Sequence, residues 1–219
     1  MAIKPILFNT EMVRVILDGR KSCTRRLVKP QPDGKHTFPL GFVTDSTEKK
    51  EVGCFGFGID EYGGSIKYVK PPYQPGDILY VRETWKKAPN GYYYYEDWQR
   101  NDIADVTKWK PSIHMPKEAA RIWLKVTSVR VERLQEINGD DALAEGVDKY
   151  IHANGTLNED QTITSFIGIW NSTIKKSDID RYGWDANPYV WIIEFERCAK
   201  PAESPYAWND AIHKLTKGV

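Results

Sequence analysis

The segment Gly19–Lys29 contains the strongest candidates for catalysis and ligand binding in the chain. Five of its eleven residues are basic and none is acidic, although the formal net charge of the whole chain is only +1. Within this segment, Lys21 and Thr24 stand three residues apart. A concentrated positive patch attracts phosphates and other anions. A lysine crowded by arginines also has its charged form disfavoured, which favours a reactive amine. The segment therefore predicts a nucleotide or nucleic-acid ligand and indicates a reactive lysine.

Other patterns that suggest chemistry are weaker. Ser112 and His114 are two residues apart, but no acid lies near them and no nucleophile-elbow glycine pattern surrounds them. The glycine cluster at 53–58 has no following helix or lysine, so it predicts a hairpin rather than a phosphate loop. The four histidines are scattered without the spacing of metal ligands. We expect no metal and no cofactor.

The three cysteines indicate a reducing compartment. Cys23, Cys54 and Cys198 are odd in number, widely spaced and without a CxxC pair, which argues against a disulfide framework and a structural zinc site. Cys23 lies inside the basic segment, where neighbouring cations are expected to depress its pKa. The sequence shows neither a signal peptide nor an apolar run near the roughly 20 residues that span a bilayer. We therefore expect a cytoplasmic protein without membrane contact.

The elements that would position these residues follow from hydrophobic periodicity. A short strand is expected at 6–9, then a helix with Thr10 as its N-cap and a stop signal at Asp18–Gly19. The basic segment therefore directly follows a rigid helix. A phase change in the alternation at Thr127–Ser128 predicts a bulge, and Asn138 is a plausible helix cap. Further strands are expected at 78–85, 92–96, 120–134 and 189–196, and further helices at 134–147 and 164–174.

The chain is expected to form one domain. Residues 30–76 are rich in Pro and Gly and predict an inserted group of short hairpins, and residues 90–118 form a second insertion. The tail, 200–219, has weak patterning and is expected to be a loosely docked helix. Several strands with a few short helices over residues 1–199 predict an α+β fold built on a closed or partly closed barrel.

Four sequence blocks carry a family resemblance. In order and spacing they resemble the ASCH family of the PUA-like superfamily, over most of residues 3–197. Phage- and prophage-encoded members also carry a stretch similar to residues 109–116, so a phage or prophage origin is expected. The resemblance implies a small β-barrel with flanking short helices and a cleft used for RNA or nucleobases. The blocks are Gly19–Arg25, Pro75–Glu83, Asp141–Gly146 and Val190–Phe195.

The resemblance also implies a catalytic set. One branch of the family, the small bacterial N4-acetylcytidine amidohydrolases, uses a Lys, a Thr and a Glu, which match Lys21, Thr24 and Glu145 of this chain. In that role Thr24 supplies the attacking oxygen, Lys21 acts as a neutral amine base, and Glu145 holds the lysine or shuttles a proton. The insertions at 30–76 and 90–118 are absent from the compact enzymes and can narrow or redirect the cleft.

Six further residues are candidates for binding a substrate or nucleic acid. Arg82 and Glu83 are adjacent on a strand and point to opposite faces, so one of them is expected to face the cleft. Arg82 would then clamp a phosphate or a base edge. Trp85 either stacks on a base or packs in the core or at its rim. The six candidates are Arg20, Arg25, Arg26, Arg82, Glu83 and Trp85.

Three functions remain open at the level of sequence. The leading one is a nucleobase- or nucleotide-binding ASCH protein that removes an acyl group from N4-acylated cytidine-type substrates. The alternative is a non-catalytic RNA- or single-stranded nucleic-acid-binding module, in which Lys21 and Thr24 are phosphate contacts. A ribonuclease is the third, but it requires an acid–base or metal arrangement that we cannot identify. The balanced net charge favours a small or locally bound ligand over extensive tracking along a nucleic acid.

Overall fold

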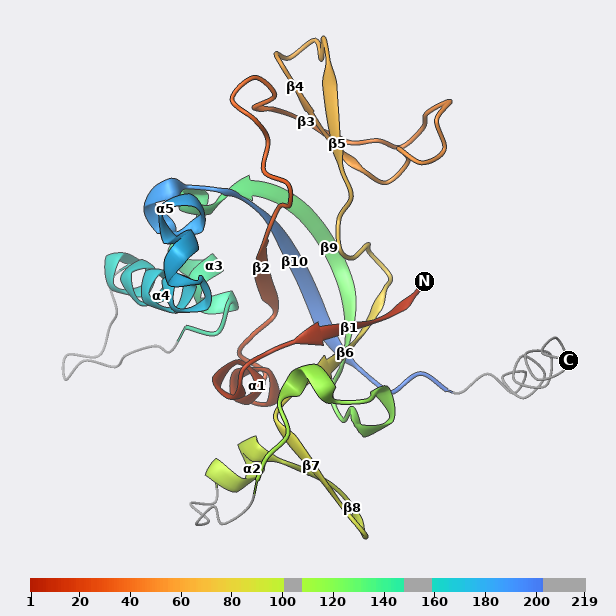
Figure 1. Ribbon diagram of the computed structural model, residues 1–219, viewed down its shortest axis with the longest axis vertical. Coiled ribbons are helices and arrows are strands. Elements are labelled where there is room, and N and C mark those ends of the chain that lie inside the picture. The colour runs from red at the N-terminus through yellow and green to blue at the C-terminus, as the bar shows by residue number, and fades with distance from the viewer. Residues whose placement is uncertain (101–107, 148–158, 203–219) are drawn as a thin grey trace, which may run out of the picture.

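A computed structural model describes residues 1–100, 108–147 and 159–202, and these form a mixed α+β protein with three sheets (Figure 1). The largest sheet has five strands in the order β1-β6-β9-β10-β2. Strand β1 runs parallel to β6, and the other neighbours are antiparallel. Its strands are β1 (Ile3–Leu7), β6 (Ile78–Arg82), β9 (Trp123–Arg133), β10 (Tyr189–Cys198) and β2 (Cys23–Leu27).

The α+β class is confirmed, whereas the described sheets are open rather than closed into a barrel. Among the described strands, β1 pairs with β6 and β2 pairs with β10, so these two strands are the edges of the large sheet. The long strands β9 and β10 curve (Figure 1). A guanidinium nitrogen of Arg26 on β2 donates to the carbonyl oxygen of Leu7 on β1 at 2.8 Å. The two edges are therefore bridged by a side chain.

The pairing of β9 with β10 contains the predicted bulge. Ser128 lies opposite Glu194, but the next residue along β10, Phe195, lies opposite Val126. Thr127 is thus the extra residue, at the position where the alternation of the sequence changes phase. The bulge allows both Val126 and Val129 to pack in the main core, although an uninterrupted strand would point them to opposite faces.

Two smaller sheets extend from the large one. One has the order β3-β4-β5, and the other is a hairpin of β7 and β8; they lie at opposite ends of the molecule (Figure 1). The first consists of short antiparallel strands, as the composition of residues 30–76 predicts. The strand expected at 78–85 instead ends at Arg82, and Trp85 begins a new strand. The bounds are β3 (Phe38–Phe42), β4 (Phe55–Gly58), β5 (Ile66–Val69), β7 (Trp85–Ala88) and β8 (Gly91–Tyr94).

The helices are short except for one. The helix expected near residue 10 is present, but its N-cap is Asn9, whose side-chain oxygen accepts from the backbone N–H of Met12 at 2.8 Å. The helix expected at 134–147 is a 3₁₀ turn followed by a separate helix that Asn138 caps, as predicted. The tail at 203–219 lies outside the described residues. The helices are α1 (Thr10–Leu17), α2 (Tyr95–Arg100), α3 (Gly139–Ala144), α4 (Glu159–Thr173) and α5 (Ile179–Tyr182), and 3₁₀ turns occur at Ser112–His114, Lys117–Ala119, Leu134–Glu136, Lys176–Asp178 and Trp184–Ala186.

Candidate functional site

A small pocket lies between the end of β1, the start of β2, the end of α3 and helix α4. Its volume is about 160 Å³. It is lined by all three residues of the implied catalytic set and by two of the arginines of the basic segment, together with aromatic and aliphatic side chains. We call it the Lys21 pocket. Its polar and aromatic lining residues are Phe8, Asn9, Lys21, Thr24, Arg25, Arg26, Glu145, Phe166, Trp170 and Thr173.

Lys21 is held where three elements meet. Helix α1 ends at Leu17, and the backbone N–H groups of Arg20 and Lys21 both donate to the carbonyl oxygen of Val15. The next residue, Ser22, donates from its backbone N–H to the carbonyl oxygen of Ala144 at 2.9 Å. These bonds fix the backbone on both sides of Lys21 against the ends of α1 and α3. The side chain is consequently buried, with 1% of its surface exposed.

Glu145 is the C-terminal cap of α3 and the partner of Lys21. The ammonium of Lys21 donates to Glu145 Oε2 at 2.7 Å and to the backbone carbonyl oxygen of Glu145, also at 2.7 Å. The lysine thus neutralises the carboxylate and satisfies a carbonyl that the helix end leaves unpaired. The ammonium also lies 5.7 Å from the centre of the Phe8 ring. Both charged groups are almost completely removed from water.

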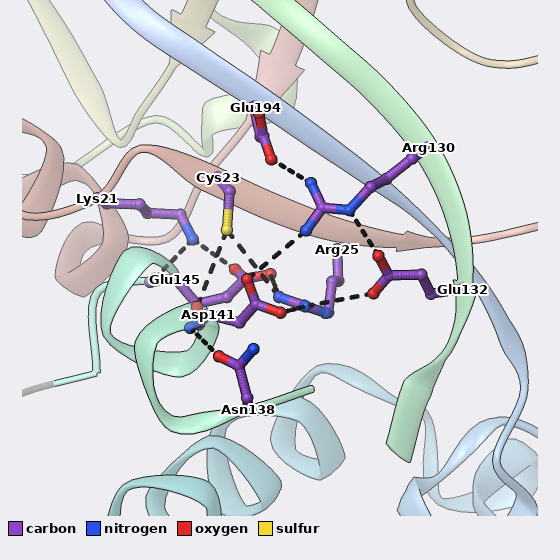
Figure 2. Close-up of polar contacts among 9 residues, drawn as sticks. All are labelled: Lys21, Cys23, Arg25, Arg130, Glu132, Asn138, Asp141, Glu145 and Glu194. Carbon is purple, nitrogen blue, oxygen red and sulfur yellow. Dashed lines mark hydrogen bonds and ion pairs between the residues drawn. The ribbon is translucent and has the colours of Figure 1, made fainter. Parts of the chain in front are cut away.

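Arg25 connects the same glutamate to a wider network of charges (Figure 2). Its guanidinium donates to Glu145 Oε1 at 3.3 Å and to Asp141 Oδ2 at 3.0 Å. Beyond it, Arg130 forms ion pairs with Asp141, Glu132 and Glu194. Arg25 is 1% exposed, and its Nε is a buried donor without a hydrogen-bond partner in the described part of the chain.

Thr24 and Arg26 alternate with Cys23 and Arg25 along β2, and all except Cys23 line the Lys21 pocket. Thr24 is buried, and its hydroxyl forms no hydrogen bond with any residue that the structure describes. The guanidinium of Arg26 lies 5.3 Å from the centre of the Phe8 ring. Burial lowers the pKa of Arg26, and interactions with the ionised forms of Tyr73 and Glu145 raise it. The lining of the pocket thus combines the unbonded hydroxyl of Thr24 with the cation of Arg26.

The remaining four predicted binding residues lie elsewhere. Arg20 is exposed, 3.4 Å from a carboxylate oxygen of Asp18, and lines a different cavity, although it belongs to the same basic segment. Arg82 lines a neighbouring cavity, and one of its nitrogens donates to the carbonyl oxygen of Ile113 at 3.2 Å. One residue of the Arg82–Glu83 pair was expected to face a cleft, and in the structure Arg82 lines this cavity.

Glu83 and Trp85 are parts of the core rather than of a binding surface. Both carboxylate oxygens of Glu83 accept from the guanidinium of Arg121 at 2.9 Å, and burial raises the pKa of Glu83. The ring of Trp85 is 5% exposed and packs in a cluster with Met115 and Trp123. Of the two roles considered for Trp85, the structure favours packing, because its ring is already covered by neighbouring side chains.

Sequence reasoning missed several residues of the Lys21 pocket. Phe8 follows β1, and Phe166 and Trp170 lie one turn apart on α4, where their spacing indicates a helix that buries one face. Asp141 was recognised as part of a motif but not as a partner of the basic segment. Asp141 and Glu145 are four residues apart at a helix end, and this spacing is the signal that both carboxylates share one face.

The environment of Cys23 contradicts the expectation of a depressed pKa. Burial and the carboxylate of Glu145 raise the pKa of this thiol to about 12, and they outweigh Lys21 and Arg25, which lower it. The sequence shows the nearby cations but not the burial or the carboxylate, which comes from a segment more than a hundred residues away. Cys23 is therefore a structural residue of β2.

Within residues 1–100, 108–147 and 159–202, no group of three or more His, Cys, Asp or Glu side chains is arranged to hold a metal ion. Among the same residues, no helix has the length and apolar character required to cross a membrane.

The chain matches no protein-family model, no curated protein and no solved structure. A functional assignment therefore depends on the pocket itself and on the sequence blocks that form it.

Proposed function

We propose that the chain is an ASCH-type protein that binds a cytosine-type base in the Lys21 pocket and hydrolyses an acyl amide on its exocyclic nitrogen. The observation that carries the proposal is the meeting of Lys21, Thr24 and Glu145 in one pocket, although Glu145 is 124 residues from Lys21. The open, curved five-stranded sheet would then correspond to the barrel of that family with a gap between β1 and β2.

The size and walls of the pocket suit a single ring. Its volume of about 160 Å³ is below the roughly 300–1,000 Å³ typical of pockets for drug-sized ligands. Phe8, Phe166 and Trp170 supply aromatic surface, and a planar base gains about 1–3 kcal/mol from stacking on such a ring.

The hydrolysis would use the hydroxyl of Thr24 as nucleophile. Lys21 first passes a proton to Glu145, 2.7 Å away, and becomes a neutral amine. Thr24 Oγ1 then attacks the acyl carbonyl carbon while its proton moves to Lys21. Collapse of the tetrahedral intermediate breaks the carbon–nitrogen bond, and Lys21 returns the proton to the leaving nitrogen. Water finally hydrolyses the threonyl ester, which releases the carboxylic acid and restores the hydroxyl, and Glu145 returns its proton to Lys21.

The charge network also supports a second candidate, a module that binds a base without reacting. Lys21 donates to Glu145 Oε2 at 2.7 Å and Arg25 donates to Glu145 Oε1 at 3.3 Å, so both oxygens of this carboxylate are already engaged by cations. In this case Lys21 and Arg25 act only as hydrogen-bond donors to the ligand.

Turnover of an acylated cytidine distinguishes the two candidates. The purified protein is incubated with N4-acetylcytidine, and release of cytidine is followed by chromatography. We expect Thr24→Val to reduce turnover at least about 100-fold, because it removes the nucleophile while nearly preserving shape. Thr24→Ser should restore part of the activity. Lys21→Met should also abolish turnover, with its folding checked by circular dichroism because Lys21 caps α3.

The matched control is Arg20→Ala, which removes a charge from the same segment but outside the Lys21 pocket, and it should keep wild-type turnover. Binding of cytidine without release from the acetylated substrate would favour the module. Turnover that Thr24→Val leaves intact would overturn the proposed chemistry.

A further inference from the structure

An aspartate, a histidine and a serine form a chain of hydrogen bonds at one end of the inserted sheet, and none of them lines the Lys21 pocket. Asp33 Oδ1 lies 2.8 Å from His36 Nδ1, and His36 Nε2 lies 3.1 Å from Ser65 Oγ. A reactive serine is recognised by this arrangement of a nucleophile, a base within its reach and a third group that orients the base. We call these three residues the Ser65 cluster.

The contacts of Asp33 decide which nitrogen of His36 carries the proton. Hydrogen bonds from Lys67 and then from His36 lower the pKa of Asp33, so this group is a carboxylate at neutral pH. A carboxylate only accepts hydrogen bonds, so Nδ1 of His36 carries the proton, and Nε2 of the neutral imidazole keeps a lone pair. The hydroxyl of Ser65 therefore donates to Nε2, which is the orientation that a general base requires.

The hydrogen bond between Ser65 and His36 distinguishes this serine from the others. Ser165 and Ser172 donate to backbone carbonyl oxygens of their own helix, and Ser46 donates to the carboxylate of Glu51. Within the described part of the chain, no other serine hydroxyl is bonded to a histidine. Ser65 is thus the one described serine whose proton has a neutral base as its acceptor.

The turn between β4 and β5 opens Ser65 to a substrate while its base stays shielded. Gly63 and Gly64 have φ of +92° and +54°, and Ser65 follows them and is exposed. The side chain of His36 is only 11% exposed. Among the residues that the structure describes, none accepts a hydrogen bond from the backbone N–H groups of Gly64 and Ser65. Free donors beside a nucleophile can stabilise the oxyanion that forms when it attacks a carbonyl group.

We propose that the Ser65 cluster is a second reactive site, which hydrolyses small carboxylic esters with a good leaving group. Ser65 lines none of the three cavities described above, so the substrate binds at the surface of the turn. An open site suits an activated ester, because this bond needs less transition-state stabilisation than an amide. The same turn exposes Ile59, Tyr62 and Ile66, which offer apolar contact to an aryl or acyl group.

The hydrolysis proceeds through an acyl-serine. Ser65 Oγ attacks the carbonyl carbon of the ester while its proton moves to His36 Nε2, and Asp33 stabilises the imidazolium. Collapse of the tetrahedral intermediate breaks the bond to the alcohol oxygen, and His36 gives the proton to the leaving alcohol. Water then attacks the acyl-serine, with His36 taking a proton from the water and returning it to Oγ. This step releases the carboxylic acid and restores the hydroxyl.

Covalent labelling tests the inference without a natural substrate. The protein is incubated with a fluorophosphonate probe, and the modified peptide is identified by mass spectrometry. Ser65 Oγ should displace fluoride from phosphorus, and Ser65→Ala should remove the label from this peptide. His36→Gln should slow the labelling at least about 100-fold, because it removes the general base, with its folding checked by circular dichroism. Ser46→Ala is the matched control, since it removes a serine hydroxyl of the same inserted region that has a carboxylate as its partner.

Asp33 is a positioning residue, because it acts through His36. Asp33→Asn should lower kcat for p-nitrophenyl acetate at least about tenfold, with KM within about twofold of the wild-type value. Asp33→Glu should restore part of the lost kcat. A change confined to KM would contradict the role of Asp33 in holding the base.

Three results would overturn the inference: no label on Ser65; labelling of Ser65 at the wild-type rate in folded His36→Gln; or turnover of p-nitrophenyl acetate that Ser65→Ala leaves intact. The inference is independent of the proposed function, and Thr24→Val keeps the two apart. This variant should label at Ser65 as the wild type does, and loss of that label in Thr24→Val would contradict a separate site.

Discussion

Cys23 lies beside the Lys21–Glu145 ion pair, and its surroundings decide its reactivity. The thiolate is the nucleophilic form of a cysteine, and burial together with Glu145 raises the pKa of this thiol to about 12. At neutral or mildly alkaline pH the thiol therefore stays protonated. The nearby cations are engaged with carboxylates, which explains why a basic segment does not activate its own cysteine.

We predict that Cys23 is protected from thiol reagents in the native protein. At pH 8, iodoacetamide should modify Cys198 first, because it is only half-buried, whereas Cys23 and Cys54 are buried. Mass spectrometry of peptides from native and urea-treated protein measures the three sites separately. All three cysteines should react after unfolding, and rapid native modification of Cys23 would contradict the burial described here.

Lys21, Arg25 and Glu145 form a network whose members depend on one another. Removing one partner from a buried ion pair typically costs about 3–5 kcal/mol, because the remaining charge stays buried without compensation. Their side chains are 1%, 1% and 9% exposed. The same groups that suit the binding of a ligand therefore also hold the start of β2 against the end of α3.

Among the elements, the junction of α3 with the end of α1 is the tightest approach near the site. Gly146 follows the cap of α3 with φ +89°, and an added Cβ would lie 2.6 Å from Val15 Cγ2 and 3.3 Å from Lys21 Cβ. Glycine permits both the left-handed conformation and this contact. The position of Glu145 thus depends on the absence of a side chain at the next residue.

We predict that Gly146→Ala destabilises the protein by about 2–4 kcal/mol, from backbone strain and overpacking together. The free energy of unfolding in urea measures the effect. Gly19→Ala is the matched control, since Gly19 also has a positive φ of +73° but has open space around its Cβ position. It should lose only about 1–2 kcal/mol, from the backbone alone. Equal losses in the two variants would show that the contact with Val15 is unimportant.

The elements show what the sequence can and cannot predict. Alternation located the bulge at Thr127, and local capping chemistry identified Asn138, because both signals lie within a few residues. The break after Arg82 was missed, since the apolar pattern continues to Trp85 although the chain turns. The Lys21–Glu145 pairing was expected from the family resemblance alone. The cavity beside Arg26 was predicted only in part, because Lys70 and Arg82 come from distant segments that only the fold brings next to the basic segment.

At the scale of the whole molecule, the inserted sheet shares the core of the rest of the chain. Phe55 and Phe57 of β4 and Val69 of β5 pack in the same cluster as Trp191 of β10. The ring centres of Phe57 and Tyr189 are 4.9 Å apart. Residues 30–76 thus contribute apolar area to the main core, in addition to supplying Lys70 to the wall of a cavity beside Arg26.

We predict that Phe57→Ala costs about 3–5 kcal/mol of stability, as expected for a fully buried aromatic side chain. Phe38→Ala in the paired strand β3 should change stability by less than about 1 kcal/mol, because Phe38 is 42% exposed. Thermal and urea unfolding of both variants measure this difference. A separate unfolding transition for the inserted sheet would contradict a shared core.

The two edge strands of the large sheet have a consequence for how the protein is made. Strands β1 and β2 both lie within the first 27 residues, yet β2 is held in the sheet by β10, at residues 189–198. During synthesis, the wall that carries Thr24 and Arg26 therefore has no neighbouring strand until nearly two hundred residues have been translated. Contacts of such long sequence separation form late and slowly. A nascent chain that is released before β10 has been translated therefore lacks the binding site. Only a chain that includes β10 is expected to bind the ligand.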